Sequence, residues 1–202
     1  LIQSYSKFFL NKKISIGAQN CYHKDNFGAN TGAVSSLMIK SVGAQYVLVG
    51  HSDNRSEGDT NEMLKSKVKN SLNNKLKVVF CIGENKEQKI NKKTFEVLEN
   101  QIKNVLEEKF NFKDIIVAYE PIWSIGTGQI PEASDLLKTT MFIKKILKNI
   151  FKKSSPAVLY GGSVDGNNIT LFKKLNEIDG FLIGGASKSD KNFIDIIKNY
   201  YR

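Results

Sequence analysis

The residues best suited to chemistry lie between Ala118 and Gly128, in the stretch Ala-Tyr-Glu-Pro-Ile-Trp-Ser-Ile-Gly-Thr-Gly. An apolar run typical of a strand, Ile115 to Val117, precedes it, and Glu120 stands where this predicted strand ends. Pro121 fixes its own φ angle and biases Glu120 away from helical conformation. A carboxylate held in this way can act as a general base, although a glutamate before a proline at a strand end is more commonly part of a solvated turn.

An unusually apolar loop follows Glu120. Its residues are Pro121, Ile122, Trp123, Ser124, Ile125, Gly126, Thr127 and Gly128. Proline restricts the backbone at the start of this loop, and glycine allows a wider range of backbone conformations at its end. The pattern predicts a lid that closes over a site and excludes water, whereas a tryptophan taken alone would more commonly belong to a core.

A histidine follows a second buried strand. His51 comes directly after Val47 to Gly50 and begins the polar stretch Ser52 to Arg55. If a helical turn begins at Ser52, its N–H groups disfavour the charged imidazolium. The neutral ring can then donate a hydrogen bond and polarise a carbonyl oxygen. The alternative is a histidine with a purely structural role.

Glycines gather at three places: Gly126 in the lid, Gly161-Gly162-Ser163, and Gly184-Gly185-Ala186-Ser187. Glycine lets backbone N–H groups approach an anion, and a helix N-terminus adds a favourable field. Two Gly-Gly pairs after the last two strands of a βα series match the phosphate site of α/β barrels. Together with the base, the neutral ring and the lid, they predict proton abstraction next to the carbonyl of a small phosphorylated substrate.

A repeated strand–helix pattern must position these residues. The predicted strands are Ile14–Gln19, Tyr46–Gly50, Lys77–Ile82, Asp114–Tyr119, Ala157–Tyr160 and Phe181–Ile183. The predicted helices are Val34–Ser41, Asn61–Leu72, Thr94–Lys109, Glu132–Lys152, Asn168–Leu175 and Asn192–Tyr201. Because the strand runs are almost continuously apolar, we expect parallel strands covered by helices. A doubly wound sheet and a (β/α)₈ barrel both fit, and functional residues at nearly every strand end favour the barrel.

Composition limits the function classes. The 202 residues suit a single domain, 1–202, and the net charge of +10 is scattered over predicted helices. We therefore expect no nucleic-acid surface, although the positive field can attract a small anion. No apolar run approaches the roughly 20 residues of a membrane span, so we expect no membrane partner. Cys21 and Cys81 form no Cys-x-x-Cys motif, so the sequence indicates neither a disulfide nor a zinc site. This fits a reducing compartment. We expect a cytoplasmic location, with an organellar form as the alternative.

Six blocks of the sequence, in order, resemble the triosephosphate isomerase family. They are Gly17–Tyr22, Val49–Ser52, Cys81–Glu84, Ala118–Gly128, Tyr160–Val164 and Gly180–Ser187. The resemblance implies an α/β TIM (β/α)₈ barrel that interconverts dihydroxyacetone phosphate and D-glyceraldehyde 3-phosphate through an enediolate, in glycolysis and gluconeogenesis. It implies no metal and no organic cofactor.

The resemblance also assigns roles, and this family is a standard example of acid–base roles set by environment. Glu120 would shuttle the proton, and neutral His51 would polarise the carbonyl. Backbone groups would hold the phosphate, and two side chains would secure the closed lid. The phosphate-binding residues would be Gly126, Ser163, Gly184 and Gly185, and the lid contacts would be Tyr160 and Ser163.

The chain departs from the family pattern at its start. The family's first strand, with its active-site Asn and Lys, is absent, and only about six of eight βα units are visible. Six strands cannot close a barrel of this type. We therefore expect a fragment, or a fold in which another segment supplies the missing strands, and little isomerase activity from this chain alone.

Smaller departures bear on assembly. Asp53-Asn54-Arg55 replaces the usual Glu-Arg-Arg, Thr31-Gly32-Ala33 replaces Thr-Gly-Glu, and Gln129 stands where a Lys is frequent. The resemblance implies that the Glu replaced by Ala33 and the Arg replaced by Asn54 belong to a dimer interface. We expect a homodimer through the loop from Phe27 to Thr31.

Two other functions compete. An inactive phosphate-binding protein would be expected to lack Glu120 or His51, and both are present. Another phosphate-binding barrel enzyme, such as one of amino-acid biosynthesis, would have no reason to keep the lid block.

Overall fold

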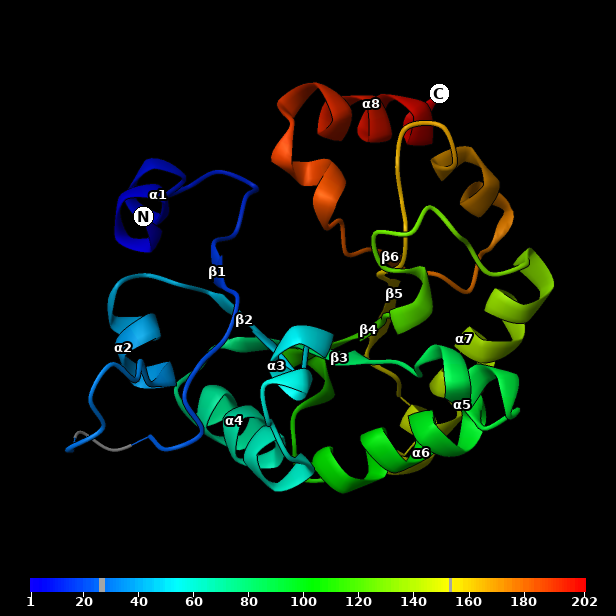
Figure 1. Cartoon of the computed structure of the whole chain (residues 1–202). Helices are drawn as coiled ribbons and strands as arrows, with labels where there is room; N and C mark the ends of the chain where they lie inside the picture. The colour runs from blue at the N-terminus through cyan, green and yellow to red at the C-terminus, as the bar shows by residue number, and fades with distance from the viewer. Residues whose placement is uncertain (26–27, 153) are drawn as a thin grey trace.

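Six parallel strands form one sheet in the computed structural model, which describes residues 1–25, 28–152 and 154–202. The strands are β1 (Gly17–Ala18), β2 (Tyr46–Val49), β3 (Lys77–Ile82), β4 (Ile115–Tyr119), β5 (Ala157–Tyr160) and β6 (Gly180–Phe181). Their order in the sheet is their order in the chain, and Figure 1 shows the sheet with its helices in an arc around it. The predicted α/β barrel architecture with six βα units is confirmed. Within the described residues β1 and β6 do not pair, so the sheet is open.

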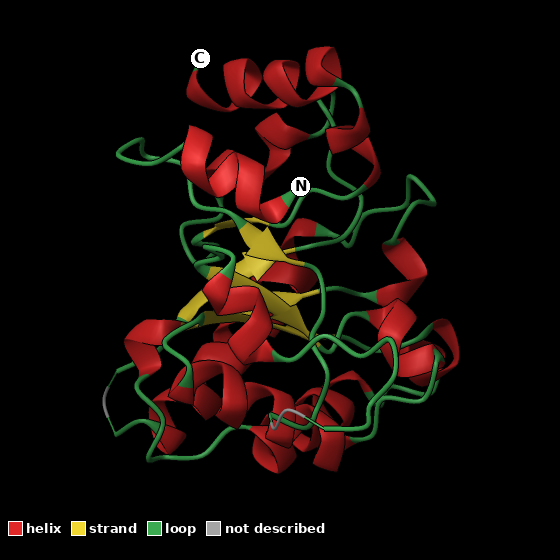
Figure 2. Ribbon diagram, turned by 90° about the vertical axis from the view of Figure 1, so that its left-hand side faces the viewer, coloured by secondary structure: helices red, strands yellow, loops and turns green. Residues whose placement is uncertain are grey.

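Helices lie along the outer side of the sheet (Figure 2). The α-helices are α1 (Ile2–Phe8), α2 (Ser36–Ser41), α3 (Ser52–Ser56), α4 (Asn61–Asn73), α5 (Lys86–Ile90), α6 (Thr94–Val105), α7 (Ala133–Ile150) and α8 (Asp190–Tyr201). The 3₁₀ turns are η1 (Phe112–Asp114), η2 (Ile122–Ser124), η3 (Ile169–Lys174) and η4 (Gly185–Lys188). Side-chain caps at Ser35, Thr60 and Ser189 start α2, α4 and α8, because each oxygen accepts a backbone N–H of the first turn.

Sequence and structure differ at the two edges of the sheet. The predicted strand Ile14–Gln19 is reduced to two residues in β1, and the predicted strand Phe181–Ile183 becomes Gly180–Phe181. Each edge strand has only one neighbour to bond to, and its ladder is correspondingly short. The predicted helix Asn168–Leu175 is a 3₁₀ turn instead of an α-helix. The short helices α1 and α5 were not predicted.

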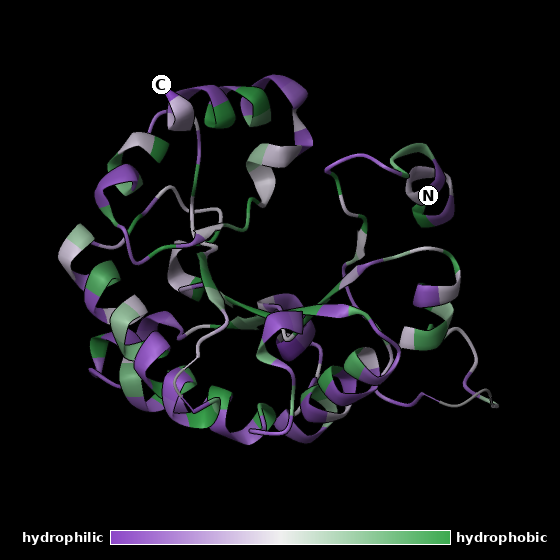
Figure 3. Cartoon of the chain, turned by 180° about the vertical axis from the view of Figure 1, so that it is seen from behind, coloured by the Kyte–Doolittle hydropathy of each residue, from purple (hydrophilic) through white to green (hydrophobic). Residues whose placement is uncertain are grey.

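The sheet is apolar on both faces, which explains the continuous apolar runs of the sequence. Val78, Phe80 and Ile82 belong to the main core between the sheet and its helices, and Val79 and Cys81 belong to a second cluster on the other face. The apolar neighbours in this inner cluster are only partly buried: Tyr46, Leu48, Ile116, Leu159 and Leu182. Figure 3 shows hydrophobic strands inside helices of mixed character. No helix in the described part of the chain has the length and apolar character needed to cross a membrane.

Candidate active site

A cavity of about 600 Å³ lies at the carboxyl ends of the strands. The six residues predicted to act in catalysis or phosphate binding line it together: His51, Glu120, Gly126, Ser163, Gly184 and Gly185. They come from the loops after β2, β4, β5 and β6. The parallel sheet therefore brings to one place residues that are far apart in the chain.

Glu120 follows β4 directly and is only 4% exposed. Its N–H donates to the carbonyl oxygen of Ile82 at 2.7 Å, so the backbone is fixed against β3. On the other side Gly161 leaves space for the carboxylate, since a Cβ there would lie 2.7 Å from Glu120 Cγ. Burial raises the pKa of Glu120 above its ordinary value of 4.5. A carboxylate with a raised pKa accepts a proton more readily than one in water.

His51 precedes α3, which begins at Ser52 as the sequence argument required. Its Nδ1 accepts the N–H of Asp53 at 3.2 Å. A ring nitrogen that accepts a hydrogen bond carries no proton, so the neutral ring holds its proton on Nε2. Nε2 lies 3.6 Å from Glu120 Oε1 on the cavity side. The two side chains thus leave a donor and an acceptor facing the same space.

Arg55 holds the loop that carries His51. Its guanidinium donates to the carbonyl oxygens of Gly50 at 2.8 Å and Cys81 at 3.0 Å, and so bridges the ends of β2 and β3. Gly50 adopts a φ of 82°, a conformation that favours glycine.

The lid, residues 121–128, begins with the 3₁₀ turn η2 and ends in a turn in which Gly126 and Gly128 have positive φ angles. Ser163 bonds to both halves of it. Its Oγ donates to the carbonyl oxygen of Ser124 at 2.6 Å and accepts the N–H of Gly128 at 3.1 Å. Tyr160 Oη lies 3.2 Å from Ser124 Oγ. The structure therefore brings Tyr160 and Ser163 against the lid.

The start of the lid has partners that the sequence argument did not assign. Trp123 Nε1 donates to Glu84 Oε1 at 2.8 Å, and Tyr119 Oη lies 3.2 Å from both oxygens of the same carboxylate. Glu84 is 1% exposed, and this burial raises its pKa. Its position at the end of a predicted strand was the only signal in the sequence.

The glycine-bearing loops line the cavity. Gly185 begins η4 and Gly184 precedes it, so their N–H groups lack partners within that turn. The N–H of Ser163 instead bonds to Ser124 Oγ at 3.2 Å. Two acidic residues that were not predicted as site residues, Asp53 and Asp165, line the same cavity.

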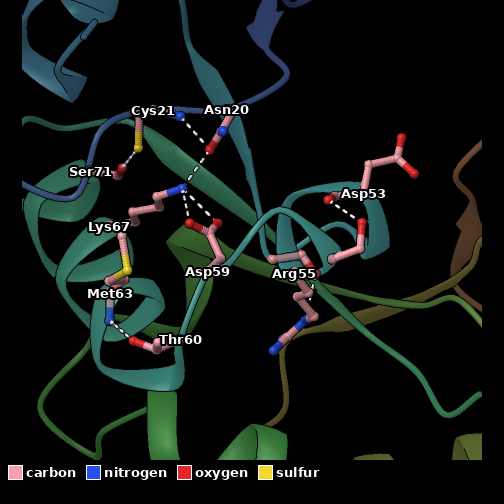
Figure 4. Close-up of polar contacts among 11 residues, drawn as sticks. Asn20, Cys21, Asp53, Arg55, Asp59, Thr60, Met63, Lys67 and Ser71 are labelled. Carbon is pink, nitrogen blue, oxygen red and sulfur yellow. Dashed lines mark hydrogen bonds and ion pairs between the residues drawn. The ribbon is translucent and has the colours of Figure 1, made fainter.

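A buried ion pair supports the loop between α3 and α4 (Figure 4). Lys67 Nζ donates to Asp59 at 2.6 and 2.8 Å and to Asn20 Oδ1 at 2.9 Å, while Asn20 lines the active-site cavity. The Lys67 and Asp59 side chains are 4% and 9% exposed. The sequence held a signal for the burial of Lys67, which lies three residues after Leu64 on the apolar face of its helix, but none for its partner.

No group of three or more His, Cys, Asp or Glu side chains that could hold a metal ion is found among residues 1–25, 28–152 and 154–202.

Comparison with known proteins gives consistent matches. The family model of triosephosphate isomerase matches residues 1–200. The triosephosphate isomerase of Dictyoglomus thermophilum is 40% identical over 200 residues, which is 96% of this chain and 80% of the relative. That of Wolbachia pipientis wMel is 40% identical over 193 residues, or 96% of this chain and 75% of the relative. The crystal structure of triosephosphate isomerase from Bartonella henselae superposes with a TM-score of 0.90 at 29% identity, over 100% of this chain and 83% of that one.

These likenesses and the cavity at the strand ends define an α/β-barrel enzyme of the aldose–ketose isomerase class. The family model covers nearly the whole chain, and the relatives match it along most of their own length. The chain belongs to the triosephosphate isomerase family.

Proposed function

We propose that the cavity interconverts dihydroxyacetone phosphate and D-glyceraldehyde 3-phosphate, with Glu120 as base and His51 as electrophile. The observation that carries this assignment is the pairing of a buried carboxylate with the Nε2–H of a neutral imidazole, 3.6 Å apart in one cavity. Membership of the triosephosphate isomerase family supplies the substrate class.

The reaction follows from these two groups. Glu120 removes a proton from the carbon next to the substrate carbonyl, while His51 Nε2–H donates a hydrogen bond to the carbonyl oxygen. The electron pair of the broken C–H bond forms the enediolate, whose negative oxygen the hydrogen bond stabilises. After a proton moves between the two substrate oxygens, protonated Glu120 returns its proton to the neighbouring carbon. The raised pKa of Glu120 suits both the uptake and the return of the proton.

The phosphate group fits the glycine-bearing loops. The N–H groups of Gly184 and Gly185 at the start of η4 supply fixed donors, and Gly126 of the lid adds a third loop to the same wall. The N–H of Ser163 would exchange its bond to Ser124 for one to phosphate. Closure of the lid then excludes water, which protects the enediolate from side reactions.

A second copy of this chain is the partner that we propose. The predicted contact loop runs from Phe27 to Thr31, and Phe27 lies outside the described residues. The nearby Val34 is 52% exposed, which suits burial against a partner. Light scattering of an active form tests the assignment, and a monomer at micromolar concentration would contradict it.

A coupled isomerase assay tests the activity. The 202-residue chain is assayed alone and after fusion to the part of the Dictyoglomus relative that lies outside the matched region. Because the sheet is open and its inner cluster only partly covered, we expect turnover from the fusion and little from the chain alone. Full turnover from the chain alone would contradict the requirement for more strands. Inactivity of both forms would favour an inactive phosphate-binding protein.

A further inference from the structure

Trp123, in the first turn of the lid, is held at two points by residues outside the lid. Its Nε1 donates to Glu84 at 2.8 Å, and Lys89 Nζ lies 3.4 Å from the centroid of the Trp123 ring. Glu84 follows β3, and Lys89 lies on α5. The start of the lid is therefore docked on the connection between β3 and α6.

The contact of Lys89 with Trp123 is close. The other cation–π contacts among the described residues have distances of 5.6 to 5.9 Å, such as that of Arg55 with Phe80 at 5.8 Å. An ammonium over an indole face is attracted by the ring quadrupole, and tryptophan is the strongest aromatic partner. Both side chains are half-buried, which reduces the competition from water.

The residues around this contact also hold the backbone of the candidate base. Glu84 accepts a hydrogen bond from Tyr119, which immediately precedes Glu120, and its carbonyl oxygen accepts the N–H of Ile122 at 3.0 Å. Burial raises the pKa of Glu84. The nearby ammonium of Lys89 lowers the same pKa by a smaller amount. Displacement of Trp123 would thus loosen the chain on the C-terminal side of Glu120.

We propose that Lys89 is a positioning residue for the reaction proposed above, because its ammonium holds Trp123 and with it the first half of the lid. Ser163 holds the second half from the opposite side of the loop. Loss of the ammonium shifts the lid towards undocked positions by about two- to fivefold, the lower part of the range that a cation–π contact supports.

Fluorescence tests the proposal without substrate. Trp123 is the only tryptophan of the sequence, so its emission reports on the lid alone. Lys89→Gln removes the charge, Lys89→Arg keeps it, and Lys86→Gln removes a charge from an exposed position of the same helix. We expect a red-shifted emission and about a twofold or greater rise in acrylamide quenching for Lys89→Gln only. Equal quenching in all four proteins, or an equal change in Lys86→Gln, would overturn the role of Lys89.

Turnover provides a second readout in a form with isomerase activity. We expect Lys89→Gln to lower kcat/KM by about two- to fivefold and Lys89→Arg to keep kcat/KM near the parent value. The melting temperatures of both variants should equal that of the parent. Failure of the proposed function would remove this turnover but leave the fluorescence difference. Unchanged fluorescence would overturn the role of Lys89 whatever the activity.

Discussion

His51 and Glu120 face each other with Nε2 and Oε1 3.6 Å apart, although they follow β2 and β4, two strands that are not neighbours in the sheet. The intervening strand β3 ends at Ile82, and Gly83 follows it beside the backbone of Glu120. A Cβ at Gly83 would collide with the carbonyl oxygen of Glu120. The missing side chain at Gly83 therefore lets the backbone that carries the proposed base lie close to the chain after β3.

Glu120→Gln should lower kcat/KM by about 10²- to 10⁴-fold in an active form, since an amide cannot accept the proton. In the parent protein kcat/KM should fall in acid with an apparent pKa above 4.5, because burial raises the pKa of Glu120. A pH–rate profile from pH 4 to pH 9 checks both statements. An unperturbed profile with near-normal activity in Glu120→Gln would contradict the assignment.

The same substitution should change stability in a pH-dependent way. A raised folded pKa means that the native state binds the Glu120 proton more tightly than the unfolded state. This stabilising contribution is fully present below pH 4.5 and is lost as pH rises through the folded pKa. In urea unfolding, the free energy of unfolding of Glu120→Gln should therefore exceed that of the parent at pH 8 but not at pH 4. Exposed Glu96→Gln is the matched control and should show no such difference.

Lys67→Met should destabilise the fold by about 3 to 5 kcal/mol, because it leaves Asp59 as a buried charge without its partner. The double variant Lys67→Met/Asp59→Leu should recover part of this loss. Lys103→Met removes one member of an exposed pair with Glu99 and should cost only about 0.3 to 0.5 kcal/mol. Chemical unfolding of the four proteins provides the comparison, and equal costs for Lys67→Met and Lys103→Met would contradict it.

Gly162→Ala should disturb the contact between the lid residue Ser124 and Tyr160. A Cβ at Gly162 would collide with Tyr160 Oη and would lie 2.7 Å from Ser124 Oγ, so both lid contacts must shift. A cost of about 1 to 3 kcal/mol is typical of such overpacking. Gly184→Ala is the control, since no heavy atom lies within 4 Å of its added Cβ. Thermal unfolding should separate the two variants.

Ser163→Ala should release the lid from its anchor. The change removes the hydrogen bonds to the Ser124 carbonyl and from the Gly128 N–H, each worth about 0.5 to 1.5 kcal/mol. Amide hydrogen exchange at Gly128 should accelerate, whereas exchange in β3 should not change. Equal protection of Gly128 in both proteins would show that the lid does not depend on Ser163.

Much of this fold could be predicted because strands and their carboxyl ends leave strong marks in a sequence. Continuous apolar runs placed β3 and β5 at the correct residues, and a carboxylate, a histidine and glycines at strand ends predicted one shared cavity. Periodicity could not place the short α5, whose capping box of Asn85 and Gln88 acts over only five residues. The lengths of the edge strands β1 and β6 were overestimated. Strand length depends on hydrogen bonding to a neighbouring strand, which a local sequence pattern does not show.

The contacts between distant segments were the least predictable. Lys67 and Asp59 pair because α4 packs against the loop after α3, and Lys89 reaches Trp123 because α5 ends beside the lid. Each depends on the relative placement of two elements, which a residue pattern within one element does not contain.

The order of the strands has a consequence for how activity would appear during refolding. Each strand pairs only with its neighbours in the chain, so helix and sheet signals can develop unit by unit from any starting point. The proposed site draws on the ends of β2, β4, β5 and β6, and it is complete only after the last of these units has joined. Circular dichroism should therefore recover before phosphate binding does, and catalytic competence should be the final property to return.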